Sequence, residues 1–224
     1  MMDLSKSYDF FQPEMCSERL HIIGCGAIGS TVAENLVRCG LTKLTLYDFD
    51  VVESKNIANQ MFLAADVGRP KVEAVADALL RINPDIGQDL RLKPEGYTGQ
   101  KLSGYVFLCV DNIDLRREIA TKYQSSQFIK GMFDFRMRLT DAQHYAAAWS
   151  DKTAVESFIN SMAFSPEEAD AETPVSACNV TLSVAPTVRS IVAAGVANFI
   201  NFVKGGRIRK MILVDAFNFS MDAF

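Results

Sequence analysis

Cysteine is scarce in this sequence, and its arrangement excludes one common use. The 224 residues contain five cysteines, an odd number, with no Cys-x-x-Cys pair among them. Paired cysteines at that short spacing are typical of structural zinc sites, so we expect no structural zinc. Widely scattered cysteines, some within apolar segments, indicate buried free thiols in a reducing compartment rather than a disulfide framework.

Excess positive charge and long apolar runs are also missing. With 23 basic and 27 acidic residues the net charge is −4, which gives no overall attraction to nucleic acid or to an anionic membrane. Residues 1–18 hold no apolar core of a signal peptide, and no uncharged apolar run reaches the roughly 18 residues of a transmembrane helix. We therefore expect a cytoplasmic protein with neither nucleic acid nor membrane as a partner.

Length and composition predict a single main domain. A chain of 224 residues, 49% of them hydrophobic, is long enough to bury a substantial core. Residues 1–18 are interpreted as a short polar N-terminal arm, with Tyr8, Phe10 and Phe11 as candidate anchors. Residues 19–224 form the domain, and within it the acidic, proline-bearing segment 164–177 is expected to be an exposed loop.

The segment 19–60 has the most informative pattern. An apolar run at 20–23 predicts a buried strand, and it leads directly into the glycine turn 24–29, GCGAIG. An amphipathic helix, a second strand at 43–47 and Asp48 follow. This order favours a nucleotide site, in which backbone N–H groups approach phosphate and the carboxylate accepts hydrogen bonds from ribose hydroxyls. The alternative is a structural turn that only packs the helix on the strand.

The rest of the chain alternates between helical and strand periodicity. Helices are expected after Pro70, after Asn112 as a cap, from residue 151 and over 186–203. Strands are expected at 89–93, 105–110, 128–133, 143–149 and 211–215, and the phenylalanine-rich tail 217–224 can pair beside the last of them. We therefore predict an α/β fold: a Rossmann-like, mostly parallel sheet with helices on both faces and antiparallel strands added at the C-terminal end.

Several motifs in a consistent order resemble those of the ThiF/MoeB/E1-like adenylyltransferases, the ubiquitin-activating enzyme-like family. The resemblance runs from residue 19 to residue 215, nearly the whole chain. The matching segments are the glycine turn, the Asp48-Phe49-Asp50 triplet with Glu53, KNIANQ at 55–60, VGRPK at 67–71, Asp111-Asn112 with Arg116, and CNVTLSVAPTVRSIVAAGVANFI at 178–200. We identify the chain as a short, divergent member.

The resemblance implies ATP-dependent adenylation. In this family a C-terminal glycine carboxylate attacks the α-phosphate of ATP and gives an acyl-adenylate and pyrophosphate. Asp48 would hold the ribose, and Asn56 and Lys71 would contact the triphosphate. Asp111 would carry Mg²⁺, a hard cation that prefers carboxylate beside phosphate oxygens. The implied nucleotide-binding residues are Gly24, Gly26, Gly29, Asp48, Asp50, Asn56, Asn59, Gln60, Lys71 and Asn112, and Lys71 and Asp111 are the implied catalytic residues.

Three of the implied residues also have a purely structural interpretation. Lys71 can be a solvated lysine at a helix start, and Asp111 can be an acid that the N-terminal helix dipole favours. Cys178 falls where some family members carry a cysteine used in sulfur or thioester chemistry, a later transfer step. The acidic residues upstream of it would disfavour the thiolate, and the alternative is an inert, partly buried thiol.

The sequence departs from the family at its arginines. Asn59 occupies the position of an arginine that contacts the phosphates, and residues 1–18 lack the RYxRQ-type segment that often reaches across a dimer. Arginine binds phosphate oxygens bidentately, and asparagine cannot replace its charge. Arg69, Arg116 or a partner would have to supply it. The zinc-binding Cys-x-x-Cys pairs of many members are absent as well.

Three functions remain open. The leading one is an adenylyltransferase, a nucleotidyltransferase that uses ATP and Mg²⁺ on a small ubiquitin-like or sulfur-carrier protein ending in glycine. The second is a non-catalytic E1-like subunit that binds nucleotide or a partner. The third, a NAD-binding Rossmann oxidoreductase, is disfavoured by the Asp111-Asn112 and GRPK motifs. We also expect a homodimer, because helix 186–203 carries more apolar surface than one sheet face needs and because the family is commonly dimeric.

Overall fold

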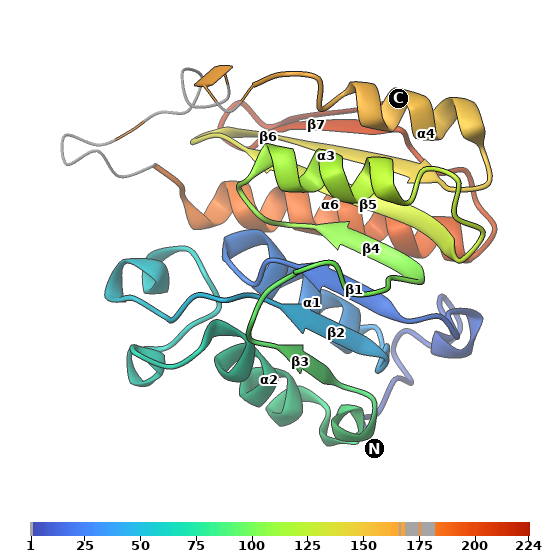
Figure 1. Ribbon diagram of the computed structural model, residues 1–224. Coiled ribbons are helices and arrows are strands. Elements are labelled where there is room, and N and C mark those ends of the chain that lie inside the picture. The colour runs from blue at the N-terminus through green and yellow to red at the C-terminus, as the bar shows by residue number, and fades with distance from the viewer. Residues whose placement is uncertain (1, 166, 169–174, 176–181) are drawn as a thin grey trace.

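The computed structural model describes residues 2–165, 167, 168, 175 and 182–224. Within these residues eight strands form one sheet in the order β3-β2-β1-β4-β5-β6-β7-β8 (Figure 1). The strands are β1 Leu20–Ile23, β2 Leu44–Tyr47, β3 Arg91–Lys93, β4 Gly104–Leu108, β5 Ile129–Met137, β6 Asp141–Ala148, β7 Met211–Asp215 and β8 Ser220–Ala223. The α-helices are α1 Ala27–Arg38, α2 Lys71–Ile82, α3 Ile113–Lys122, α4 Lys152–Asn160 and α6 Ala185–Val203.

The first five strands of the chain run parallel, and their order reverses beside β1. β1 pairs with β2 on one side and with β4 on the other, both in parallel. Open α/β sheets bind ligands at the carboxyl ends of the strands beside such a reversal of strand order. The glycine turn follows β1, Asp48 follows β2, and Asp111 follows β4.

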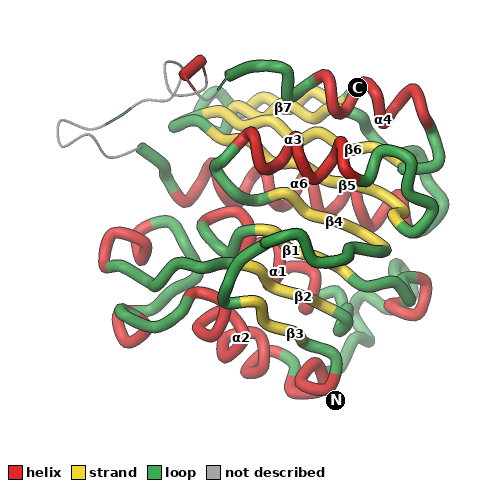
Figure 2. Tube along the Cα trace, viewed as in Figure 1, coloured by secondary structure: helices red, strands yellow, loops and turns green. Residues whose placement is uncertain are grey.

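Two hydrophobic layers hold helices on both faces of the sheet (Figure 2). Helices α1, α2 and α6 cover one face, and α3 and α4 pack together on the other (Figure 1). On the α6 side the Phe133 ring lies 5.2 Å from Phe107 and 5.3 Å from Phe199 between centroids. Gly195 lets α6 approach this closely, because an added Cβ would lie only 2.2 Å from Phe135 Cε1. The predicted fold class is confirmed.

Helix α6 is a core helix of this fold. Its length and composition alone would suffice to cross a membrane, but half of its apolar stretch is buried inside the molecule. It packs on α1 and on strands β5, β6 and β7. Its buried residues are Thr187, Val188, Ile191, Val192, Gly195, Val196, Asn198, Phe199 and Ile200.

The C-terminal half of the sheet is antiparallel, as predicted. β6, β7 and β8 each pair antiparallel with the strand before them. The apolar pattern predicted a strand that ends at Phe133, but β5 continues to Met137. The extension follows from pairing with β6, in which Phe135 lies opposite His144 and Met137 opposite Ala142.

The N-terminal arm packs against the domain, and only one of its three candidate anchors is buried. Phe11 is 4% exposed, whereas Tyr8 and Phe10 are 41% and 67% exposed. Lys204 at the end of α6 lies 3.5 Å from the Phe10 ring centroid, a cation–π contact. In the predicted loop 164–177, Glu167, Glu168 and Val175 are exposed, and most of the other residues lie outside the described part of the chain.

Candidate functional site

The three glycines of the turn have different reasons to be glycine. Gly24 has a φ of +93°, and a Cβ there would lie 2.9 Å from the carbonyl carbon of Cys109. A Cβ on Gly29 would lie 1.8 Å from the carbonyl oxygen of Gly24. Gly26 is different, because the nearest atom to an added Cβ is Gln60 Oε1 at 4.0 Å. Two glycines therefore serve internal packing, and the third faces open space.

That open space lies at the N-terminus of α1. Gly26 is the N-cap residue and offers no side chain to the first-turn N–H groups. Unsatisfied N–H groups and the positive end of the helix dipole favour an anion such as phosphate. Beside them, Gln60 Oε1 is buried without a hydrogen-bond partner in the described residues. A bound ligand with a hydroxyl or N–H donor would satisfy it.

Asp48 joins the ends of β1 and β2. Its Oδ2 accepts the backbone N–H of Cys25 at 2.7 Å, and its Oδ1 accepts that of Asp50 at 2.8 Å. Burial raises the pKa of Asp48, although both hydrogen bonds oppose the shift. Each carboxylate oxygen keeps a further lone pair, so the same side chain can hold the glycine turn and accept ribose hydroxyls.

Lys71 lies inside the site rather than in solvent. It is the first residue of α2, directly after Pro70, and is 8% exposed. Its Nζ lies 2.7 Å from Asp50 Oδ2, and its backbone N–H donates to the carbonyl of Asp50 at 2.9 Å. The interpretation as a solvated lysine at a helix start is therefore wrong. An ammonium carries three donors, so Lys71 can bind a phosphate oxygen while it keeps Asp50.

The 53–60 loop carries three of the four amide side chains of the predicted site, Asn56, Asn59 and Gln60. Asn56 is 8% exposed, and its Oδ1 accepts the backbone N–H of Glu53 at 2.9 Å. Asn59 Nδ2 donates to Ser183 Oγ at 2.7 Å, which ties this loop to the segment before α6. Asn59 thus has a structural partner of its own where the family pattern has a phosphate-binding arginine.

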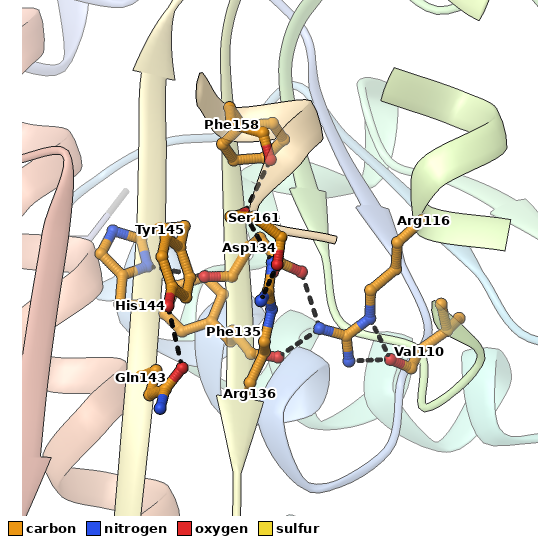
Figure 3. Close-up of polar contacts among 10 residues, drawn as sticks. All are labelled: Val110, Arg116, Asp134, Phe135, Arg136, Gln143, His144, Tyr145, Phe158 and Ser161. Atoms are coloured by element: carbon orange, nitrogen blue, oxygen red, sulfur yellow. Dashed lines mark hydrogen bonds and ion pairs between the residues drawn. The ribbon is translucent and has the colours of Figure 1, made fainter. Parts of the chain in front are cut away.

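The two arginines considered as substitutes are both ion-paired. Arg69 contacts Asp66 at 3.0 Å and Asp77 at 2.5 Å. Arg116 is 7% exposed and lies 2.6 Å from Asp134, with its remaining contacts directed to backbone carbonyls (Figure 3). Either guanidinium would have to break these contacts to reach a phosphate.

Asp111 and Asn112 divide two roles at the end of β4. Asn112 caps α3, with its Oδ1 accepting the N–H of Leu115 at 2.9 Å, as predicted. Asp111 is exposed and makes no hydrogen bond or ion pair with the described residues. Mg²⁺ in nucleotide sites uses one or two carboxylates with substrate phosphates and water. The exposed Asp111 carboxylate, without a partner among the described residues, fits that mode. No cluster of three or more metal-ligating side chains occurs in the described residues.

The cysteines behave as predicted wherever the structure describes them. Cys16, Cys25 and Cys109 are buried free thiols and Cys39 is partly buried. Burial raises the pKa of each of them, to about 12 for Cys16. These four are not thiolate nucleophiles. Cys178 lies outside the described residues.

Sequence analysis missed two residues beside the site. Asp134 is completely buried in β5, and the side chain of Arg136, two residues further, is 15% exposed. The signal was present in the sequence, since Asp134 and Arg136 interrupt the otherwise apolar run 131–137. A buried carboxylate in that setting needs cationic partners.

The pattern of the ThiF family matches residues 9–223. The chain belongs to the ThiF family. This ThiF-family chain is 33% identical over 114 residues to ubiquitin-like modifier-activating enzyme 5 of Caenorhabditis elegans, covering 44% of this chain and 27% of the relative. It is 35% identical over 121 residues to molybdopterin-synthase adenylyltransferase of Salmonella typhimurium, covering 51% and 48%. The chain therefore spans between about a quarter and half of these relatives.

The solved structures show the same fold. Escherichia coli MccB, crystallised with ATP, superposes with a TM-score of 0.72 at 16% sequence identity, covering 95% of this ThiF-family chain and 65% of MccB. The structure of PaaA superposes with a TM-score of 0.66 at 17% identity, again covering 95% of this chain and 65% of the other. The fold of these structures extends across nearly the whole chain.

Proposed function

We propose that this chain is an adenylyltransferase, which transfers AMP from ATP to the C-terminal glycine carboxylate of a small ubiquitin-like or sulfur-carrier protein. The observation that carries the proposal is the open glycine turn at the end of β1. Gly26 leaves the N-terminus of α1 open there, and Asp48 is hydrogen-bonded to the same glycine turn. The relatives named as activating enzymes and adenylyltransferases support the reaction class.

The residues at the carboxyl ends of β1, β2 and β4 have separate roles in this reaction. Asp48 accepts hydrogen bonds from the ribose, the first turn of α1 and Lys71 bind the phosphates, and Gln60 Oε1 accepts a donor from the bound substrate. Asp111 would hold Mg²⁺, which would supply positive charge to the phosphates. The acceptor carboxylate then attacks the α-phosphate in line, and its oxygen–phosphorus bond forms as the bond to pyrophosphate breaks. Positioning and charge neutralisation do most of this work.

A second function is favoured by a specific observation. Asn59 is bound to Ser183, and Arg69 and Arg116, the two arginines considered as substitutes, are both engaged in ion pairs rather than free for the phosphates. A C₂ homodimer, in which the partner copy supplies that charge, is part of the leading proposal. Without it, the chain would serve as a non-catalytic E1-like subunit that binds nucleotide.

Pyrophosphate exchange into ATP distinguishes the adenylyltransferase from the non-catalytic subunit. The leading proposal expects exchange that depends on an acceptor protein ending in Gly-Gly, that is lost in Asp111→Ala, and that is unchanged in Cys178→Ser, because adenylation uses no thiol. Light scattering at tens of micromolar reports the dimer. ATP binding without exchange, for any acceptor, would instead establish the non-catalytic subunit.

A further inference from the structure

A carboxylate in β5 lies between two arginines on the α3 and α4 side of the sheet. Asp134 is 0% exposed. Its Oδ1 lies 2.6 Å from Arg116 Nη1, and its Oδ2 lies 2.6 Å from Arg136 Nε (Figure 3). Each oxygen of one buried carboxylate thus accepts from a different guanidinium. We call these three residues the Asp134 cluster.

One end of the cluster holds the turn that carries Asp111. Arg116 donates to the carbonyl of Val110 from both Nε, at 2.7 Å, and Nη2, and to the carbonyl of Phe135 from Nη1 at 2.7 Å. Val110 directly precedes Asp111. The planar guanidinium has fixed donor directions, so the position of Arg116 determines where the Val110 carbonyl, and therefore the next residue, can lie.

The other end of the cluster holds the end of α4. Arg136 donates from Nη1 to the carbonyl of Ser161 at 2.7 Å and from Nη2 to its Oγ at 2.8 Å. The guanidinium carbon also lies 4.2 Å from the Tyr145 ring centroid and 5.4 Å from that of Phe164. Ser161 is the residue that ends α4, so Arg136 fixes the start of the segment 161–164.

We propose that the Asp134 cluster positions the Asp111 carboxylate for its metal and couples it to the segment 161–164. The proposal rests on the proposed function, since it concerns the same nucleotide site. Asp134, Arg116 and Arg136 act as positioning residues, because none of them needs to touch the substrate. The shared carboxylate is the link, since it cannot move toward one arginine without lengthening its hydrogen bond to the other in a buried, low-dielectric setting.

The coupling is tested by loosening each end without removing its charge. Arg116→Lys keeps a cation for Asp134 but loses the forked contact with Val110, and Arg136→Lys loses the two contacts with Ser161. Arg117→Lys is the matched control, because Arg117 adjoins Arg116 on α3 but pairs with Asp114 at the surface. ATP binding is titrated against Mg²⁺ for each protein, and hydrogen exchange is followed at the amides of 161–163.

These amides are suitable reporters because each donates back into α4: Ser161 to Ser157, Met162 to Ile159 and Ala163 to Asn160. We expect Arg116→Lys to raise the Mg²⁺ concentration at half-saturation about tenfold, as loss of a ligand-orienting partner commonly does. Arg136→Lys should raise it in the same direction, although Arg136 lies at the far end of the cluster. Both variants should speed exchange at 161–163, and Arg117→Lys should change neither quantity.

The outcomes separate this inference from the proposed function. If wild type binds Mg²⁺ and ATP but Arg136→Lys speeds exchange without moving the Mg²⁺ midpoint, the two ends are independent and the coupling is wrong. If wild type binds no ATP at any Mg²⁺ concentration, the proposed function and the inference both fail. Should the lysine variants not fold, Ser161→Ala removes one Arg136 acceptor from a half-exposed position, together with the hydrogen bond that Ser161 Oγ donates to the carbonyl of Phe158 at 2.7 Å. It should shift the midpoint in the same direction, and an unchanged midpoint would overturn the coupling.

Discussion

Lys71 Nζ lies 2.7 Å from Asp50 Oδ2, and the backbone of the same lysine donates to the carbonyl of Asp50 at 2.9 Å. Two contacts between one pair of residues join the first turn of α2 to the loop after β2. The lysine is 8% exposed, whereas the Asp50 side chain is 50% exposed. A buried ammonium with a solvated partner is a cation held in place for a further anion, which in the proposed function is the triphosphate.

Lys71→Ala should reduce the rate of pyrophosphate exchange by about a hundredfold or more, the usual effect of removing one group that stabilises developing charge. The matched control is Lys43→Ala, because Lys43 is exposed, lies at the amino end of β2, and its Nζ contacts the carbonyl of Ser17. Exchange rates measured at saturating acceptor decide the matter. Equal rates in the two variants would remove Lys71 from the site.

ATP with Mg²⁺ should raise the melting temperature, and NAD should not. A ligand that binds only the native state at 100 times its dissociation constant adds about 2.7 kcal/mol, or roughly 5–10 °C for a chain of this size. Asp111, the proposed Mg²⁺ ligand, and Lys71 favour a triphosphate over a dinucleotide. Equal shifts with NAD in a thermal melt would return the chain to the oxidoreductase interpretation.

Gly26→Ala and Gly29→Ala should have opposite consequences. An added methyl at Gly26 meets no atom closer than 4.0 Å, so the fold should survive while ATP binding weakens, because the methyl enters the space left for phosphate. At Gly29 the methyl would lie 1.8 Å from the Gly24 carbonyl oxygen, and the free energy of unfolding should fall by about 1–3 kcal/mol or more. Chemical denaturation and ATP titration of both variants separate the two effects. Similar losses of stability would contradict the assignment of Gly26 to the ligand.

Asn59→Arg tests whether a partner copy supplies the missing charge. If none does, the rate of pyrophosphate exchange should rise by about tenfold or more, since a guanidinium supplies the charge that asparagine lacks. If the partner copy does, the rate should stay level or fall. The new side chain must give up the 2.7 Å contact with Ser183. Asn59→Ala, which loses the same contact without adding charge, is the control. If Asn59→Arg is no faster than Asn59→Ala, the missing charge comes from another group or the chain does not catalyse adenylation.

His144 should make the protein sensitive to acid. It is completely buried, its Nδ1 lies 3.0 Å from the carbonyl oxygen of Asp134, and its Nε2 lies 3.2 Å from Asn198 Nδ2. Burial lowers the pKa of His144 to about 4, from 6.5 in the unfolded chain. Because the unfolded state takes up the proton first, stability is full above pH 6.5 and is lost as the pH falls toward 4, by about 3 kcal/mol.

Denaturation curves at pH 7, 5.5 and 4.5 test the histidine assignment. His144→Gln cannot titrate, so its stability should depend less steeply on pH than that of wild type across this window. His21, whose pKa burial also lowers to about 4, remains as a second contributor in both proteins. Identical slopes for wild type and His144→Gln would show that other groups govern the acid sensitivity.

Local pattern was enough to predict the elements and their order. The run at 20–23, the glycine turn and the amphipathic helix after it were readable because strand and helix periods differ and glycine permits a φ of +93° at Gly24. Asn112 was predictable as a cap because its side chain needs only the N–H three residues ahead. The motif order alone indicated the ThiF family, which the comparison confirmed.

Partner choice was decided only by the tertiary structure. Asn59 meets Ser183 across 124 residues of sequence, and Arg116 turns inward to Asp134 instead of toward a phosphate. No periodicity contains that information, because it depends on which strands become neighbours and which faces they turn to each other. The sequence determined which charged and polar groups this chain carries at its strand ends. The packing of β4 beside β5, and the contact of the 53–60 loop with the segment before α6, decided which of them remain available to a ligand.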